Sequence, residues 1–192
     1  MRNKNLQALV ESAILIALAA ALSLIALFKM PMGGTVAPFA MAPLVIIGLR
    51  WGAKWGLGAG LVYGILQAIQ GADNFQWVTG IVAWAGVALL DYLLAFTAYG
   101  LAPIVAKPFK TNKAVGWGVG AAVGGLLQFV CSFLSGILLW GTWAPEGTKV
   151  WVYSLTYNGS YALPNAVLTV IGTVVAMALL ERFFPVKSED RK

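Results

Sequence analysis

One acidic residue, Asp91, lies in the middle of a long apolar stretch of the sequence. It stands within Leu89-Leu90-Asp91-Tyr92-Leu93, and no other charged residue is close to it in the chain. A charge in an apolar environment is costly unless it finds a partner, so such residues commonly mark functional sites. Two interpretations are open: Asp91 forms a structural hydrogen bond to a neighbouring helix, or it is the counter-charge for a cationic ligand. The apolar segments contain no basic partner, which favours the ligand.

Aromatic and amide side chains gather in two further parts of the chain. The larger group comprises Trp140, Trp143, Trp151, Tyr153, Tyr157, Asn158 and Tyr161, and the smaller one comprises Phe75, Gln76, Trp77 and Trp84. Aromatic residues also form belts at membrane interfaces, which accounts for several tryptophans. Aromatic faces beside a carboxylate, however, suit a flat cationic heteroaromatic ligand, because they supply stacking, cation–π attraction and a counter-ion. Side-chain amides can bind the edge of such a ring.

The groups that catalysis needs are scarce. The sequence has no histidine and a single cysteine, Cys131, so zinc sites, disulfides and histidine-based triads are not expected. Ser132 and Ser135 have no candidate base beside them. There is no G-x-x-x-x-G-K-[ST] motif, so ATP is not bound through a P-loop. We therefore predict a protein that is not an enzyme, has no cofactor, and takes energy from an ion gradient or a partner subunit.

The elements that must position these residues are membrane helices. Of the 192 residues, 60% are hydrophobic and only 10% are charged, whereas roughly a quarter are charged in soluble domains. About 20 apolar residues span the lipid core as a helix. The apolar runs predict an all-α integral membrane protein, a single domain over 1–192, with six transmembrane helices at about 8–28, 36–49, 55–70, 78–105, 114–140 and 161–184. A polar, aromatic loop is expected at 141–157, and a charged tail at 185–192.

The basic residues predict the orientation of these spans. In the six-span order, eleven of the 13 lysines and arginines fall on one side, and only Lys29 and Lys149 fall on the other. Loops rich in lysine and arginine stay in the cytoplasm. Both termini are therefore expected to be cytoplasmic, and the segments 31–35, 71–76 and 141–157 are expected to lie outside.

Small residues recur every four positions in three of the expected spans. They form the faces Ala13, Ala17 and Ala21; Gly56, Gly60 and Gly64; and Gly116, Gly120 and Gly124. Such faces let helix backbones approach closely within a membrane. Either they pack inside the helix bundle or they dock another membrane subunit. Internal packing is favoured for the two glycine faces, and both interpretations stay open for the alanine face.

Several motifs resemble one known family. They are Met32-Gly33-Gly34-Thr35 with Ala42-Pro43-Leu44 and Leu49-Arg50-Trp51-Gly52; Leu89-Leu90-Asp91-Tyr92-Leu93-Leu94-Ala95-Phe96; Phe133-Leu134-Ser135-Gly136 through Trp140; and Tyr153-Ser154-Leu155-Thr156-Tyr157-Asn158. Over nearly the whole chain, the sequence resembles the thiamine-specific substrate-binding (S) components of energy-coupling factor (ECF) vitamin transporters. The resemblance implies a high-affinity binding subunit for thiamine or a related cationic heteroaromatic, in the cell membrane of a prokaryote.

The resemblance also implies residue roles. Asp91 and Tyr92 would contact the ligand, Trp140 would stack on it, and Tyr153 with Asn158 would close the site from outside. The Ala13, Ala17, Ala21 face would dock a membrane coupling subunit, and two ATPase subunits would supply energy. Two positions depart from the family pattern: Ser132 replaces a common histidine, and Trp84 lies where a Tyr-x-x-His-Pro motif is common. Together they predict a changed ligand wall, in which Trp84 fills part of the space.

Other functions compete with this interpretation. A stand-alone, proton-coupled carrier for a small cationic solute is the main alternative. The single membrane carboxylate allows proton coupling, although it is weak support for it. An intramembrane enzyme or a scaffold for other subunits has no nucleophile–base set to support it. Transport by vesicles that lack any ATPase separates the stand-alone carrier from the S component.

Overall fold

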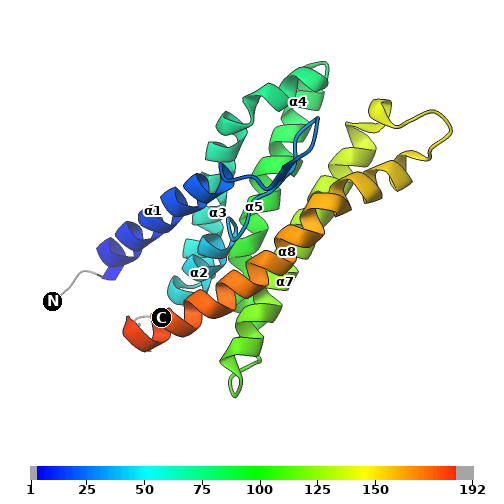
Figure 1. Cartoon of the computed structure of the whole chain (residues 1–192). Coiled ribbons are helices and arrows are strands. Elements are labelled where there is room, and N and C mark those ends of the chain that lie inside the picture. The colour runs from blue at the N-terminus through cyan, green and yellow to red at the C-terminus, as the bar shows by residue number, and fades with distance from the viewer. Residues whose placement is uncertain (1–3, 185–192) are drawn as a thin grey trace.

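The computed structural model describes residues 4–184, and the fold is mostly helical (Figure 1). The long helices are α1 (Lys4–Ser23), α3 (Ala53–Gln70), α7 (Lys113–Leu138) and α8 (Val150–Phe183). A fifth long segment, 81–106, combines α4 (Ile81–Val87), the π-helix η2 (Ala88–Leu94), α5 (Ala95–Thr97), the 3-10 helix η3 (Ala98–Leu101) and α6 (Ala102–Ala106). The shorter elements are β1 (Phe28–Lys29), β2 (Thr35–Val36), α2 (Ala42–Trp51), and the 3-10 helices η1 (Ala72–Trp77) and η4 (Gly141–Trp143).

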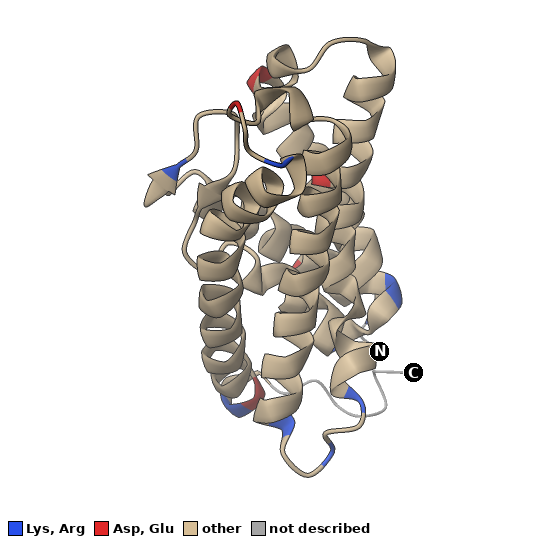
Figure 2. Ribbon diagram, turned by 90° about the vertical axis from the view of Figure 1, so that its right-hand side faces the viewer, with Lys and Arg blue, Asp and Glu red and all other residues tan. Residues whose placement is uncertain are grey.

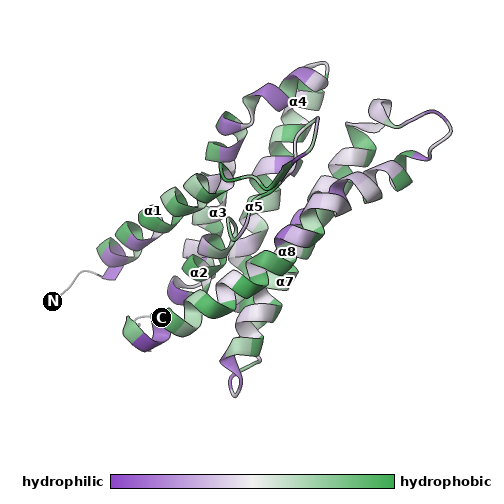
Figure 3. Cartoon of the chain, viewed as in Figure 1, coloured by the Kyte–Doolittle hydropathy of each residue, from purple (hydrophilic) through white to green (hydrophobic). Residues whose placement is uncertain are grey.

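Four of the described helices are long and apolar enough to cross a membrane: α1, the segment 81–106, α7 and α8. Their outer faces carry large apolar side chains, and Ile81 and Val82, for example, are 78% and 80% exposed. Polar side chains such as Ser135, Asn158 and Thr169 are buried instead. Figure 3 shows apolar colours along these helices, and Figure 2 shows charged residues gathered mainly near their ends. A surface of this kind is suited to lipid rather than to water.

The predicted second span differs most from the structure. Helix α2 has only 10 residues, about 15 Å at the usual helical rise, and all of them are buried. The residues before it form a hairpin in which Phe28 pairs with Val36 and Lys29 with Thr35. Irregular backbone at membrane depth requires shelter by protein or a cavity; this hairpin borders the cavity described below, whereas Phe28 and Lys29 of β1 are exposed. Hydropathy alone does not distinguish such a segment from a short span.

The expected loop at 141–157 is only partly a loop. Its second half is helical, because α8 begins at Val150. Helix α8 has 34 residues and is therefore about 51 Å long, well beyond the roughly 30 Å lipid core. Trp151, Tyr153 and Tyr157 of the expected loop thus lie on a helical extension, whereas Trp143 lies in η4. The expected tail at 185–192 lies outside the described residues.

The two glycine faces pack inside the bundle, as favoured. A Cβ atom at Gly60 would lie 2.5 Å from the Phe96 carbonyl oxygen, and one at Gly120 would lie 2.8 Å from the Ala102 carbonyl oxygen. The glycines of α3 and α7 therefore let both helices contact the backbone of the segment 81–106, one on each side. Close backbone contact of this kind is the usual role of small residues in membrane helices.

Helix α1 presents its alanine face outward. Ala13, Ala17 and Ala21 are exposed, whereas Ala8, Ser12 and Ala19 face the bundle. The predicted docking face is thus exposed on the described chain. Its exposure favours docking over packing inside the bundle.

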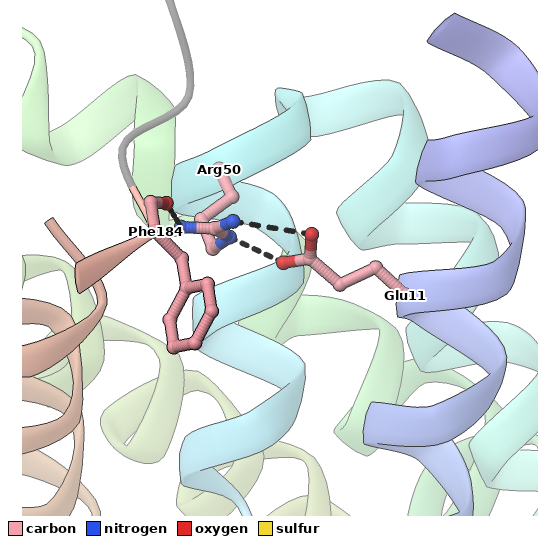
Figure 4. Close-up of polar contacts among 3 residues, drawn as sticks. All are labelled: Glu11, Arg50 and Phe184. Atoms are coloured by element: carbon pink, nitrogen blue, oxygen red, sulfur yellow. Dashed lines mark hydrogen bonds and ion pairs between the residues drawn. The ribbon is translucent and has the colours of Figure 1, made fainter. Parts of the chain in front are cut away.

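An ion pair ties α1 to the rest of the bundle (Figure 4). The Arg50 guanidinium on α2 donates to both carboxylate oxygens of Glu11 on α1. It also donates to the Phe184 carbonyl oxygen after α8, at 3.1 Å. Arg50 is buried, so its charge depends on these partners. Three elements are thereby joined at one end of the molecule.

Candidate functional site

The π-helix η2 positions the membrane carboxylate. Both Asp91 and its neighbour Tyr92 line one central cavity, together with Val87 and Phe96 of the same segment. A π-helix widens the turn, so that side chains five apart align, and such insertions are frequent at functional sites. The widened turn brings two adjacent side chains to the same cavity.

Asp91 is held by one of its two oxygens. Its Oδ2 atom accepts a hydrogen bond from the Ser135 hydroxyl at 2.6 Å and one from the Trp140 indole nitrogen at 3.2 Å. The indole nitrogen also lies 3.2 Å from the Ser135 hydroxyl oxygen. Within the described chain, Oδ1 has no recorded hydrogen bond and Asp91 has no ion pair. The carboxylate is therefore oriented by Ser135 of α7 and by Trp140, which follows α7, while one oxygen stays available.

A second wall comes from one face of α8. Tyr153, Tyr157, Asn158, Tyr161 and Asn165 follow one another at helical spacing and all line the cavity. The Tyr161 hydroxyl donates to the Asn158 Oδ1 atom at 2.7 Å, and Asn158 Nδ2 donates to the Ser154 carbonyl oxygen at 3.0 Å. Asn158 is therefore fixed by neighbours on its own helix.

The β1–β2 hairpin covers the cavity and is fastened to α8. The Tyr157 hydroxyl donates to the Gly33 carbonyl oxygen at 3.0 Å and accepts from the Met32 amide at 3.1 Å. Gly33 and Gly34 have φ of 98° and 86°, a region that glycine enters without strain. A Cβ atom at Gly34 would also lie 2.5 Å from the Tyr161 ring. Glycine thus permits both the turn and its close approach to the wall.

A second fastening lies at the base of the hairpin. The Asn165 side chain accepts from the Ala37 amide at 3.0 Å and donates to the Thr35 carbonyl oxygen at 2.6 Å. It pairs with the backbone as a neighbouring strand would, so these two polar groups are not left unsatisfied. Tyr157 holds the tip and Asn165 holds the base.

The cavity has a volume of about 220 Å³ and is partly open. It is lined by the hairpin, by α3 and the segment 81–106, and by α7 and α8. Its walls combine the carboxylates of Asp91 and Asp73, the ammonium of Lys29, several aromatic rings and a set of amides and hydroxyls. Concave sites with a few fixed polar groups among apolar walls are typical of small-molecule binding.

Six of the seven substrate-binding residues predicted from sequence lie together in this lining: Asp91, Tyr92, Ser132, Trp140, Tyr153 and Asn158. Trp84 does not line the cavity. Its indole nitrogen donates to the Val78 carbonyl oxygen at 2.9 Å, its ring meets Phe75 edge-on, and 47% of its surface is exposed. The space beside Ser132 is bounded by Tyr161 rather than by Trp84.

The Tyr92 hydroxyl forms its hydrogen bonds with the segment 71–74. It accepts from Asn74 Nδ2 at 3.1 Å and lies 3.3 Å from the Gly71 carbonyl oxygen, while its ring stacks on Phe75. Tyr92 therefore offers the cavity mainly its ring, and it holds η1 in place. This role is invisible in sequence, because Asn74 lies 18 residues away.

The structure adds lining residues that sequence reasoning did not select. On α3 and η1 these are Gln67, Gln70, Asp73 and Asn74, and elsewhere they include Gln128 and Asn165. Gln67 connects helices, donating to the Ser23 and Tyr63 hydroxyls at 2.8 Å each. A signal for Gln128 was present: it precedes Ser132 by one turn and Ser135 by two, on the same face of α7.

Fold and site together define a multi-pass helical membrane protein with a covered, partly polar solute site. Comparison with known proteins narrows this class. Residues 9–185 match the family described as Thiamine transporter protein (Thia_YuaJ), and the chain belongs to that family. It is therefore a multi-pass plasma-membrane protein from a family of bacterial transporters rather than enzymes.

Individual relatives support this assignment. The chain is 36% identical to the thiamine transporter ThiT of Bacillus subtilis (strain 168) over 180 residues, covering 88% of this chain and 90% of that protein. It is 30% identical to ThiT of Lacticaseibacillus paracasei over 198 residues, covering 97% and 94%. A solved structure of ThiT from Listeria monocytogenes superposes with a TM-score of 0.69 at 25% identity, covering 95% of this chain and 97% of that one. The resemblance noted in the sequence is confirmed at the level of the family.

Proposed function

We propose that this protein is a high-affinity membrane binding subunit for the uptake of thiamine. The observation that carries the proposal is the half-satisfied carboxylate of Asp91, which is fixed by Ser135 and Trp140 and has no ion pair in the described chain. Thiamine carries a permanent positive charge on a flat ring. A buried cation needs a counter-charge, and an oriented carboxylate supplies it without reorganisation.

The other cavity residues suit the rest of such a ligand. Trp140 and Tyr92 offer rings for stacking, and Tyr153 and Tyr157 offer further ring faces near the hairpin. Flat aromatic ligands gain from offset stacking, and cationic ones also gain from the negative ring face. Ser132 leaves room and a hydroxyl where a larger side chain would stack. No cofactor enters this proposal, and thiamine is bound as cargo.

Titration of the detergent-purified protein with thiamine tests this function. Because Trp140 lies beside Asp91, the tryptophan fluorescence is expected to fall on binding, and the thermal midpoint to rise at micromolar ligand. The control is a thiamine analogue with carbon in place of the quaternary ring nitrogen, which keeps the shape and removes the charge. The absence of both a fluorescence quench and a thermal shift with thiamine would contradict the function. Equal affinity for the neutral analogue would contradict the counter-ion role.

We further propose six membrane segments, of which α2 is the short, buried one, with both termini in the cytoplasm. We also propose coupling to an ECF energising module of one membrane coupling subunit and two ATPase subunits. The lysine and arginine distribution supports the orientation. The exposed alanine face of α1 supports the docking, because small side chains permit close helix contact. The chain has no P-loop motif, so ATP would act through the partners.

Reconstitution separates this mechanism from a stand-alone proton-coupled carrier. Vesicles containing the protein alone are expected to bind thiamine without accumulating it, and vesicles that also contain the energising module are expected to accumulate it with ATP. Accumulation by the protein alone under a proton gradient would overturn the coupling proposal but not the thiamine site.

A further inference from the structure

Gln128 occupies the inner part of the cavity, away from the carboxylate. It lies on α7, only 9% exposed, and lines the same cavity as Asp91. Ser135, which bonds Asp91, follows it by seven residues on the same helix. Seven residues correspond to about 10 Å along a helix axis. Gln128 and the Asp91 carboxylate therefore belong to two separate parts of the cavity, the Gln128 end and the Asp91 end.

The Tyr99 hydroxyl fixes the orientation of the Gln128 amide. It donates to Gln128 Oε1 at 2.5 Å, and Tyr99 itself is fully buried. An amide whose oxygen is engaged must direct its NH₂ group elsewhere. Within residues 4–184, Nε2 has no hydrogen-bond partner, and it is not sealed from its surroundings by the atoms around it. The NH₂ group is therefore open to the cavity.

This end of the cavity differs in polarity from the Asp91 end. An amide NH₂ only donates hydrogen bonds, so it attracts a neutral acceptor such as a ring nitrogen and gives a cation no stabilisation. Leaving the donor unpaired after a ligand fills the cavity would carry a desolvation cost. A well-matched ligand thus combines a cationic ring at one end with an acceptor ring about 10 Å or less away.

We propose that Gln128 is a specificity-determining residue that donates its amide N–H to a ring nitrogen of the pyrimidine part of thiamine, and that Tyr99 is its positioning residue. The inference rests on the proposed function, since it takes thiamine as the ligand. It adds a recognition element for the uncharged ring, separate from the counter-ion at Asp91.

Affinity measurements with two ligands test the inference. One ligand is thiamine, and the other is an analogue with a benzene ring in place of the pyrimidine. Gln128→Met keeps the side-chain length and removes the donor, so it is expected to weaken thiamine binding about tenfold and to leave the analogue unchanged. Tyr99→Phe releases the amide to rotate and is expected to weaken thiamine binding by about threefold. A purely structural role would weaken both ligands equally.

Two further variants guard against misfolding and misassignment. Tyr99→Phe with Gln128→Met removes both partners, so no buried hydroxyl is orphaned, and its thiamine affinity is expected to match that of Gln128→Met alone. Gln128→Glu keeps an acceptor for Tyr99 but lacks the N–H, and it is expected to weaken thiamine binding as well. Tighter thiamine binding by Gln128→Glu would show that this end holds the cation.

The outcomes distinguish the two proposals. If the unaltered protein binds thiamine but Gln128→Met binds both ligands as before, or loses both equally, the role of Gln128 is overturned and the proposed function stands. If the unaltered protein does not bind thiamine, the proposed function fails and this inference fails with it.

Discussion

At the scale of single residues, each key side chain of the site uses one polar atom to bond the protein and keeps another available for a ligand. Asp91 uses Oδ2 for Ser135 and Trp140 and keeps Oδ1 available, and Gln128 uses Oε1 for Tyr99 and keeps its NH₂ available. Each functional side chain is thereby oriented before a ligand arrives. Pre-organisation of this kind reduces the entropy lost on binding.

The first prediction concerns the charge of Asp91. Asp91→Asn keeps the size and an acceptor oxygen but removes the counter-charge, so thiamine affinity is expected to fall about ten- to hundredfold. Titration calorimetry with thiamine and with its uncharged analogue measures the effect. The uncharged analogue is expected to bind the variant and the unaltered protein alike. Unchanged thiamine affinity would show that the role of Asp91 is purely structural.

At the scale of elements, glycines and amides determine how the site is enclosed. The glycines of α3 and α7 bring these helices against the segment that carries Asp91, and Asn165 and Tyr157 hold the hairpin over the cavity. The hairpin has only two residues in each strand, so its own hydrogen bonds cannot hold it alone. Its attachment to α8 is therefore central to closure.

The second prediction concerns that attachment. Asn165→Ala removes both hydrogen bonds to the Thr35 and Ala37 backbone, so the closed hairpin is expected to lose stability and thiamine to dissociate about five- to tenfold faster. Stopped-flow fluorescence measures the dissociation rate. Thr156→Ala is the control, because the Thr156 hydroxyl bonds only the backbone of its own helix. Equal rates in Asn165→Ala and the control would contradict the role of Asn165.

The third prediction concerns helix packing. Gly60→Ala forces a methyl group against the Phe96 carbonyl oxygen, so it is expected to destabilise the protein by about 1–3 kcal/mol. Gly58→Ala on the same helix meets nothing within 4 Å and is expected to be neutral or to stabilise by up to about 1 kcal/mol. Thermal unfolding in detergent compares the two. Equal midpoints would mean that the α3 contact is not tight.

At the scale of the whole molecule, α1 combines an exposed face with an ion pair that fastens it to the bundle. Helix α1 is exposed at Ala13, Ala17 and Ala21, and Glu11 on the same helix binds Arg50 of α2. The same guanidinium bonds the Phe184 carbonyl oxygen (Figure 4). The ion pair therefore holds the proposed docking face in a fixed position relative to the bundle that contains the site.

The fourth prediction concerns the docking face. Ala17→Trp blocks close helix contact without touching the cavity, so thiamine binding is expected to stay unchanged while ATP-dependent uptake falls at least tenfold. Val167→Trp is a matched control, since Val167 is 59% exposed on α8. It is expected to preserve both binding and uptake. Uptake unaffected by Ala17→Trp would contradict docking through this face.

Much of this protein followed from sequence alone, because membrane physics leaves few choices. The scarcity of charge predicted a helical membrane protein, and the isolated Asp91 predicted the centre of a polar site. The family motifs and the groups of aromatic residues predicted six residues that line one cavity. The glycine spacing predicted close packing, although not its partners.

Tertiary structure decided what hydropathy cannot encode. The interior of a membrane protein is sheltered, so the expected second span contains only a buried ten-residue helix, and the expected loop at 150–157 is helical. Trp84 lies outside the cavity because its indole finds a carbonyl nearby, and Gln128 enters the site because Tyr99 orients it from 29 residues away. Contacts between distant residues depend on how the helices pack, and no local pattern in the chain records them.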